Sequence, residues 1–220
     1  MSSPLLLLLG GALLGFSLFQ LRRVLAAYRR LTAFRCGFDP NGRISLAEEN
    51  EPRTAALADE LERLGFERLG LFWEQLGAAS RLDTVTFSHA GAGAFATIFH
   101  LRSGEPRLFF LTGFEGGGAA LTGAYDRPAG DARDRLLSGM PGRPLAEVLA
   151  SHAQSVERLV SRGFRPHKAF DRAARLRVAE EWYQHPMERK RFRRGLVPAV
   201  AAPAVMAVVG LCLAVLWAGG

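Results

Sequence analysis

The hydrophobic residues form two long runs at the ends of the chain and shorter patterned runs between them. Residues 5–21 are apolar or small apart from Ser17 and Gln20, and residues 196–218 contain no charge. Runs of this length suit a helix that crosses a bilayer, which needs about 20 mainly apolar residues. We therefore predict one transmembrane helix over residues 4–28 and a second over residues 196–218.

Two further segments have the spacing of amphipathic helices. Residues 52–65 carry apolar side chains at helical intervals, with Pro52 in the first turn and Gly65 at the stop. Residues 144–160 repeat this pattern. We predict that both helices pack on one face of the sheet that lies between them in the chain.

Short runs of apolar residues, separated by glycine-rich turns, fill the region between these helices. Such runs are typical of hairpin strands. Four clear runs and a weaker fifth cover residues 84–89, 94–101, 107–114, 119–125 and 66–76. We predict an α+β fold for a domain over residues 36–163: an antiparallel β-meander of four to five strands flanked by helices, with one transmembrane helix at each end of the chain.

The predicted strands carry bulky apolar residues on both faces, so the second face needs a cover. The aromatic residues that form a candidate partner face are Phe95, Phe99, Phe109, Phe110 and Phe114. Four covers are open: a helix within residues 165–184, the membrane surface, a second copy of the chain, or a different subunit. Residues 164–195 are basic and moderately amphipathic, which predicts a juxtamembrane helix among lipid headgroups. The alternative is a connector packed on the sheet.

The charge is distributed in a way that argues against nucleic acid as a partner. The net charge is +7, but residues 1–35 hold five basic and no acidic residues, and residues 162–220 hold eleven basic and four acidic residues. Residues 36–161 are therefore acidic. Basic residues beside hydrophobic ends suit anionic lipid headgroups, so we expect lipids and other membrane subunits as partners, and no nucleic acid.

Basic residues flank both predicted spans on the side of the central domain. They are Arg22, Arg23, Arg29 and Arg30 after the first span, and Arg189, Lys190, Arg191, Arg193 and Arg194 before the second. The positive-inside rule then predicts a two-pass protein of the bacterial inner membrane, with a cytoplasmic central domain and both termini periplasmic. Trp217 fits an aromatic anchor at the interface.

Small residues within the spans indicate helix packing. Gly11 and Gly15 have GxxxG spacing, and Gly210 and Ala214 repeat at the same interval. Neither apolar run, over residues 5–21 or 196–218, contains a charged residue or a histidine. We therefore expect no ion path and no ligated cofactor within them.

Candidate chemistry in the middle region is sparse. Residues 37–48 resemble part of an EF-hand calcium loop, but Gly37 stands where the first carboxylate belongs, and a turn followed by a capping box is the favoured alternative. The glycines at 91, 93 and 116–118 lie between strands, which indicates hairpin turns instead of a phosphate loop. We predict no cofactor and no metal.

The histidines do not have the spacing of metal ligands on a helix; they are His89, His100, His152, His167 and His185. His152 falls near the apolar side of the helix over 144–160, from which it would reach the sheet near Ser88, Thr112 or Glu115. It is either a buried structural histidine, which we favour, or half of an acid–base pair. We assign no catalytic residue.

Three stretches resemble a group of uncharacterised bacterial membrane-anchored proteins. They are Leu61-x-x-Leu64-Gly65-Phe66-x-x-Leu69-Gly70, Phe110-x-Thr112-x-Phe114-x-x-Gly117, and the helix from His152 to Gly163. The resemblance covers residues 36–163. It implies a membrane-tethered α+β domain and no particular activity.

These observations favour a non-enzymatic accessory or scaffolding subunit of a larger bacterial membrane complex of respiratory, photosynthetic, secretory or transport type. Two small-residue spans, excess apolar sheet surface and the lack of a reactive cluster motivate this prediction. The first alternative is a membrane-tethered regulatory module that binds a small molecule or lipid between the helix over 144–160 and the meander. The second is a membrane-tethered hydrolase that uses His152.

Overall fold

The computed structural model describes most of the central domain and a few residues near each end of the chain. Within the domain it describes residues 34–39, 52–76, 81–101 and 103–186, together with residue 188. Near the ends it describes residues 11–12, 15–20, 22, 205, 208–209, 212 and 215, all of them helical. The chain ends belong to one compact unit, and residues 35–75 and 80–185 form another, which is the domain considered below.

No helix among the described residues is both long and apolar enough to cross a membrane. This finding overturns the predicted transmembrane helix at each end of the chain, and with it the two-pass location in the inner membrane. The longer described helices are those of the domain, and each of them carries several charged side chains. Most of residues 4–28 and 196–218 lie outside the described part of the chain.

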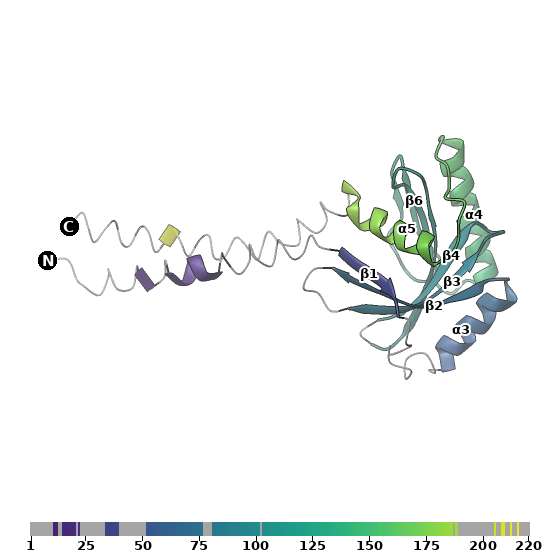
Figure 1. Ribbon diagram of the computed structural model, residues 1–220, viewed down its shortest axis with the longest axis horizontal. Helices are drawn as coiled ribbons and strands as arrows, with labels where there is room; N and C mark the ends of the chain where they lie inside the picture. The colour runs from purple at the N-terminus through teal and green to yellow at the C-terminus, as the bar shows by residue number, and fades with distance from the viewer. Residues whose placement is uncertain are drawn as a thin grey trace. The chain divides into compact units, whose positions relative to one another are not determined.

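An eight-stranded mixed sheet forms the framework of the domain (Figure 1). The strands are β1 (Phe34–Phe38), β2 (Glu67–Leu76), β3 (Leu82–His89), β4 (Ala94–His100), β5 (Pro106–Gly113), β6 (Ala119–Gly123), β7 (Gly130–Asp131) and β8 (Arg135–Gly139). Their spatial order is β1-β2-β3-β4-β5-β6-β8-β7. Strands β2 to β6 are antiparallel neighbours, β8 runs parallel to β6, and β7 pairs antiparallel with β8.

The five strands predicted for the meander coincide with β2 to β6, but the prediction of four to five strands is wrong. The additional strands are β1, β7 and β8. Strand β7 has two residues and β8 has five, so neither offers a long alternating pattern. Strand β8 also pairs in parallel with β6, and a parallel pair has no hairpin turn between its strands that would reveal it in the sequence.

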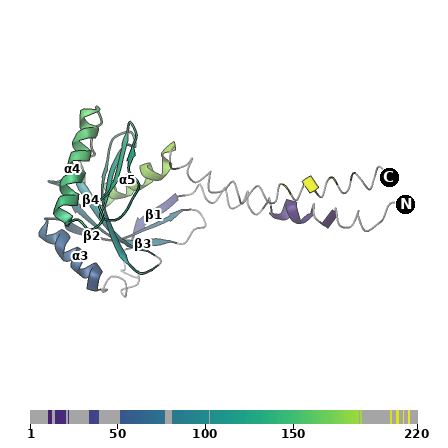
Figure 2. The ribbon, with the colours of Figure 1, turned by 180° about the vertical axis from the view of Figure 1, so that it is seen from behind.

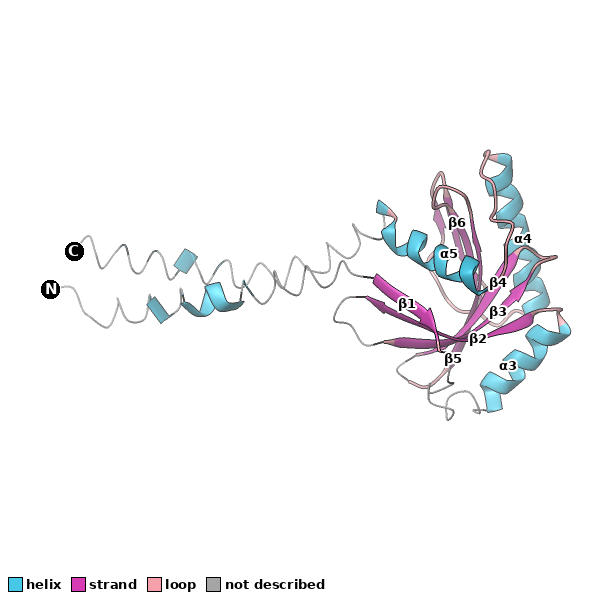
Figure 3. Cartoon of the chain, viewed as in Figure 1, coloured by secondary structure: helices cyan, strands magenta, loops and turns pink. Residues whose placement is uncertain are grey.

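Two helices cover one face of the sheet, as predicted. They are α3 (Pro52–Arg63) and α4 (Leu145–Ser161), and Figure 3 shows them along the same side of the strands. Leu61 of α3 and Val148 of α4 are fully buried against Phe87 and Phe110 of the sheet. We call this side the α4 face.

A third helix, α5 (Arg172–Gln184), covers the opposite side, which we call the α5 face (Figure 2). Its Ala174 and Val178 join a buried cluster with Phe95 and Leu121 of the sheet. The contact is close, because a Cβ atom added to Gly113 would lie 2.5 Å from Val178. Of the four covers left open by the sequence, the chain's own helix is the one that the structure shows.

The third helix is shorter than the segment predicted over residues 164–195. Residues before it pair instead with the chain at the end of β5: Glu115 N donates to Arg165 O (2.9 Å) and His167 N donates to Gly113 O (3.0 Å). The helix begins only after Asp171, whose side chain accepts from Ala174 N (2.8 Å). A side chain that caps the first turn in this way fixes where a helix begins.

Two buried arginines attach α5 to the sheet. Arg175 of α5 is 1% exposed, lies 4.2 Å over the ring of Phe72, and donates to Glu74 (3.2 Å), which also accepts from Tyr183 (2.9 Å). Arg135 of β8 is likewise 1% exposed, and its guanidinium lies 4.3 Å over the ring of Trp182. Arg175 extends from the helix to the sheet, and Arg135 extends from the sheet to the helix. The attachment of α5 to the sheet therefore uses cation–π and ionic contacts as well as apolar burial.

We expect Arg175→Met to lower the free energy of unfolding by about 2–4 kcal/mol, because it leaves the Glu74 carboxylate enclosed without its counter-charge. Adding Glu74→Gln removes that charge and keeps an acceptor for Tyr183, so the double variant should recover part of the loss. Urea unfolding followed by circular dichroism measures both. Strictly additive losses would contradict this account of the pair.

Candidate functional site

His152 is the centre of a buried polar chain between α4 and the sheet. It is 1% exposed, and its ring nitrogens lie 2.9 Å from Thr112 Oγ1 and 3.2 Å from Thr122 Oγ1. Thr112 Oγ1 is also 2.6 Å from Gly93 O, and Ser138 Oγ is 3.2 Å from Thr122 Oγ1. The chain therefore links β8, β6, α4, β5 and the β3–β4 turn.

The protons of this chain can be placed from its ends. Gly93 O can only accept, so Thr112 donates to it and must accept from His152 Nε2. In a neutral imidazole the other nitrogen is an acceptor, so His152 Nδ1 takes the proton of Thr122, which in turn accepts from Ser138. Each threonine hydroxyl then donates once and accepts once.

This arrangement makes His152 a structural residue. Burial lowers its pKa to about 3, so the ring is neutral near pH 7. Its one free lone pair is used by Thr122, and Thr112 points its proton at a carbonyl. A general base needs an available lone pair next to a nucleophile, and the structure provides neither here. Of the three residues named as candidates for contact with His152, which were Ser88, Thr112 and Glu115, the structure shows Thr112. The expected burial of His152 is confirmed.

A groove of about 650 Å³ opens where this chain ends. The β3–β4 turn provides Ala90 and Gly93, the start of the β5–β6 turn provides Glu115, and α4 provides Val156. The remaining wall is the segment from Arg165 to Phe170. The groove thus lies at one end of the interface between α4 and the meander, the region in which the alternative of a small-molecule or lipid-binding module places its pocket.

The groove is lined by more positively charged than negatively charged side chains. Arg165 and Lys168 stand on one wall and Glu115 on another, and all three are exposed. His167 also lines the groove, but its Nε2 lies 2.9 Å from Glu181 of α5. The groove therefore carries two cationic groups against one carboxylate.

A second surface lies on the α5 face and continues from the buried cluster under α5, against which Phe109 packs. Phe99, Phe109 and Tyr125 form it, with ring centroids 5.8 Å apart for Phe99–Phe109 and 5.6 Å apart for Phe99–Tyr125. All three side chains are half-buried. We call this group the aromatic surface.

Two leucines extend the aromatic surface outward. Thr84 pairs with Phe99 in the sheet register, so their side chains share a face. Side chains alternate along a strand, so Leu82, two residues before Thr84, and Leu101, two residues after Phe99, lie on that face as well. Both are exposed, at 40% for Leu82 and 41% for Leu101.

The candidate partner face predicted from the sequence is only partly available. Phe95, Phe110 and Phe114 are fully buried under the chain's own helices. Phe99 and Phe109 remain half-buried, and they belong to the aromatic surface. The sequence showed which residues were aromatic, but not which of them α5 would cover.

Of the residues predicted for membrane contact or helix packing, the structure describes three. Arg22 is exposed and helical. Among the described residues, a Cβ atom added to Gly11 or Gly15 would meet nothing within 4 Å, and the predicted helix packing at these glycines stays a prediction. The others lie outside the described residues: Arg23, Arg29, Arg30, Arg189, Lys190, Arg191, Arg193, Arg194, Gly210, Ala214 and Trp217.

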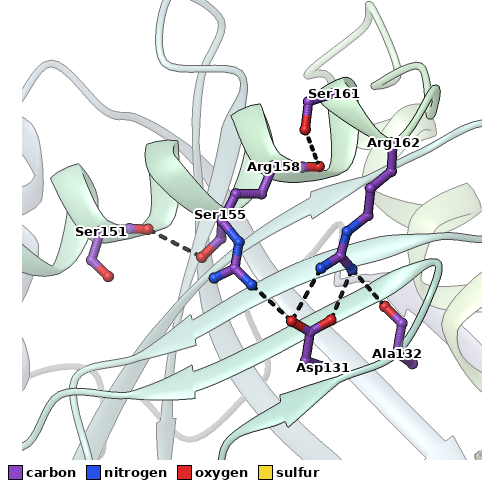
Figure 4. Close-up of polar contacts among 7 residues, drawn as sticks. All are labelled: Asp131, Ala132, Ser151, Ser155, Arg158, Ser161 and Arg162. Carbon is purple, nitrogen blue, oxygen red and sulfur yellow. Dashed lines mark hydrogen bonds and ion pairs between the residues drawn. The ribbon is translucent and has the colours of Figure 1, made fainter.

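An exposed ion cluster that the sequence did not indicate ties the β7–β8 hairpin to α4. Figure 4 shows Arg158 and Arg162 reaching from the end of α4 to Asp131, at 2.7 Å and 2.8 Å. The hydrogen bond from Arg162, together with the charges of both arginines, holds the pKa of Asp131 below its usual range. Arg162 also donates to Ala132 O (2.8 Å). All three charges are engaged with one another, so we assign this cluster a structural role.

The serines of α4 are likewise engaged within the helix. Ser155 donates to Ser151 O (3.1 Å) and Ser161 donates to Arg158 O (2.8 Å), as Figure 4 also shows. Neither hydroxyl is paired with a histidine. Among the residues that the structure describes, no group of three or more His, Cys, Asp or Glu side chains could hold a metal ion. Most of the residues of the calcium-loop candidate lie outside that part.

Comparisons of the chain with protein-family models, with curated proteins and with solved structures found no match. The resemblance of residues 36–163 to membrane-anchored bacterial proteins therefore gains no support from them. The groove, the aromatic surface and the buried chain around His152 are therefore the features that bear on its function.

We expect the His152 pKa to make stability depend on pH. The folded state keeps the ring neutral down to about pH 3, whereas the unfolded chain binds a proton near pH 6.5, so its contribution to the free energy of unfolding is complete above pH 6.5 and is lost as pH falls. From pH 7 to pH 5 the loss is about 2 kcal/mol. The difference in stability between the wild type and His152→Gln should shrink by that amount. A difference that stays constant with pH would contradict a neutral buried ring.

We expect Cys36 to be a poorly reactive thiol. Burial and the charges of Glu74 and Glu180 raise its pKa to about 12, which reduces the thiolate at pH 8 about a thousandfold relative to an ordinary cysteine. In a Cys212→Ser variant, where Cys36 is the only thiol, reaction with an aromatic disulfide reagent should be slower by about that factor in the folded than in the urea-unfolded chain. Equal rates would show that the thiol is neither enclosed nor close to these carboxylates.

Proposed function

We propose that this domain is a non-enzymatic accessory or scaffolding module that holds a partner protein on its aromatic surface. The observation that carries the proposal is the half-buried cluster of Phe99, Phe109 and Tyr125, extended by the exposed Leu82 and Leu101. Soluble domains seldom leave contiguous apolar side chains open without a use for them.

The charges near this surface favour a protein partner with acidic groups. Arg107 pairs with Phe99 in the sheet register, and Arg127 donates to the hydroxyl of Tyr125 (3.2 Å). Aromatic residues and arginine are enriched where binding energy concentrates in protein interfaces. Arg107 already donates to Glu105 (2.9 Å). We therefore expect the partner to insert apolar side chains beside a carboxylate that meets Arg127.

The alternative of a hydrolase has less support from the same geometry. His152 is fully buried, its pKa is lowered, and both ring nitrogens are engaged with threonines. The packing of the described residues favours binding over bond cleavage.

Site-specific photocrosslinking in cells tests the proposal. A benzophenone amino acid at Tyr125 should give a discrete cross-linked product, and the same amino acid at the exposed Gln154 of α4 should give none. Leu101→Asp should reduce the product about tenfold, because it places a charge in an apolar contact. Val160→Asp is the matched control, since Val160 is 47% exposed on α4, and it should leave the product unchanged.

Two outcomes would overturn the proposal. A product formed between two copies of this chain would make the aromatic surface a self-association face. A product that is insensitive to Leu101→Asp, or the absence of any product together with a monomeric mass in native mass spectrometry, would show that this surface holds no partner.

A further inference from the structure

We propose that the groove at the end of α4 binds a small amphipathic anion, namely a carboxylate or phosphate group carried on a flat apolar body. The volume of about 650 Å³ falls within the range of roughly 300–1,000 Å³ that is usual for small-molecule sites. This site is separate from the aromatic surface and does not depend on the proposed scaffolding function.

The walls of the groove are held in place before any ligand arrives. The β3–β4 turn is closed by Gly93 N donating to Ala90 O (3.2 Å), and Ala92 N donates to His89 Nδ1 (3.1 Å). Thr112 then fixes Gly93 O from below at the end of the His152 chain. Because these bonds already fix the backbone, binding requires little further ordering.

The opposite wall is attached to the end of β5. Glu115 N donates to Arg165 O, His167 N donates to Gly113 O, and Phe114 and Pro166 form a β-bridge between them. Residues 165–167 therefore act as a short extra strand beside β5. This pairing holds Arg165 and Lys168 next to the groove.

The charges select an anion. Arg165 and Lys168 are exposed. Neither side chain forms a hydrogen bond or an ion pair with another described residue, so both cations are available to bind a ligand. His167 Nε2 is already engaged by Glu181 of α5 (2.9 Å). Glu115 opposes the two cations, and its removal should therefore strengthen anion binding.

The lining also favours an apolar body behind the charged group. The ring centroid of Phe170 lies 5.3 Å from that of the buried Phe95, so Phe170 is packed against the core where it lines the groove. Pro166 and Val156 complete this apolar side. A bare inorganic ion would leave these side chains unused, so an anion with an aromatic or aliphatic body should bind more tightly.

Phenyl phosphate is a suitable probe, with inorganic phosphate and benzylamine for comparison. Titration into the full chain, followed by calorimetry and by the amide shifts of Gly93 and Glu115, should show saturable binding of phenyl phosphate. Inorganic phosphate should bind more weakly, and benzylamine should not bind. Sodium benzoate then distinguishes a carboxylate from a phosphate preference.

Variants of the wall give opposite expected effects. Arg165→Gln and Lys168→Gln should each raise the Kd about threefold to tenfold, as the loss of one charged contact does. Glu115→Gln should lower the Kd about twofold to threefold. Arg177→Gln is the matched control, since it removes one exposed arginine from α5 that does not line the groove, and Leu101→Asp should also have no effect.

Three results would overturn the proposal. They are a lack of saturable binding at millimolar phenyl phosphate, equal effects of Arg165→Gln and Arg177→Gln, and weaker binding in Glu115→Gln. Sensitivity to Leu101→Asp would place the probe on the aromatic surface, which would overturn the groove assignment without touching the scaffolding proposal.

Discussion

The requirement to cover both faces of a sheet that is apolar on both sides determines the architecture of this domain. On the α4 face, Phe87 and Phe110 are closed off by α3 and α4. On the α5 face, Phe95 and Leu121 are closed off by a single helix. This single helix leaves Phe99, Phe109 and Tyr125 half-buried, and these residues form the aromatic surface. The same constraint that builds the core therefore also creates the surface most suited to a partner.

Polar and charged groups decide where the covering helices sit. Helix α5 carries Arg175 into the interior and meets Arg135 coming from the sheet, so its position depends on matched rings and carboxylates as much as on apolar area. Helix α4 is fixed by His152, whose hydrogen bonds reach two neighbouring strands. Such contacts are directional, and they specify one arrangement among the many that apolar burial alone would allow.

The sequence was sufficient for the elements with strong periodicity and insufficient for the rest. Five strands and the helices α3 and α4 follow from alternation, helical spacing and glycine turns. The contact of His152 with the sheet was also predicted, although Thr112 was only one of three candidate partners. Strand β8 was missed because a parallel partner has no local signature. The groove was located only in outline, because Arg165 and Lys168 reach it through a pairing of residues 165–167 with the end of β5. The charge runs near the ends led to a membrane topology that the described helices do not support.

The chain position of α5 also bears on the order in which the domain is completed during synthesis. Arg172 and Arg175 contact Leu69 and Glu74, which are separated from them by 103 and 101 residues, and Tyr183 reaches Glu74 across 109. The ribosome releases the sheet strands well before this helix. The α5 face consequently stays bare through most of translation, and a nascent chain that stalls before residue 184 presents Phe95 and Leu121 to chaperones instead of to its own helix.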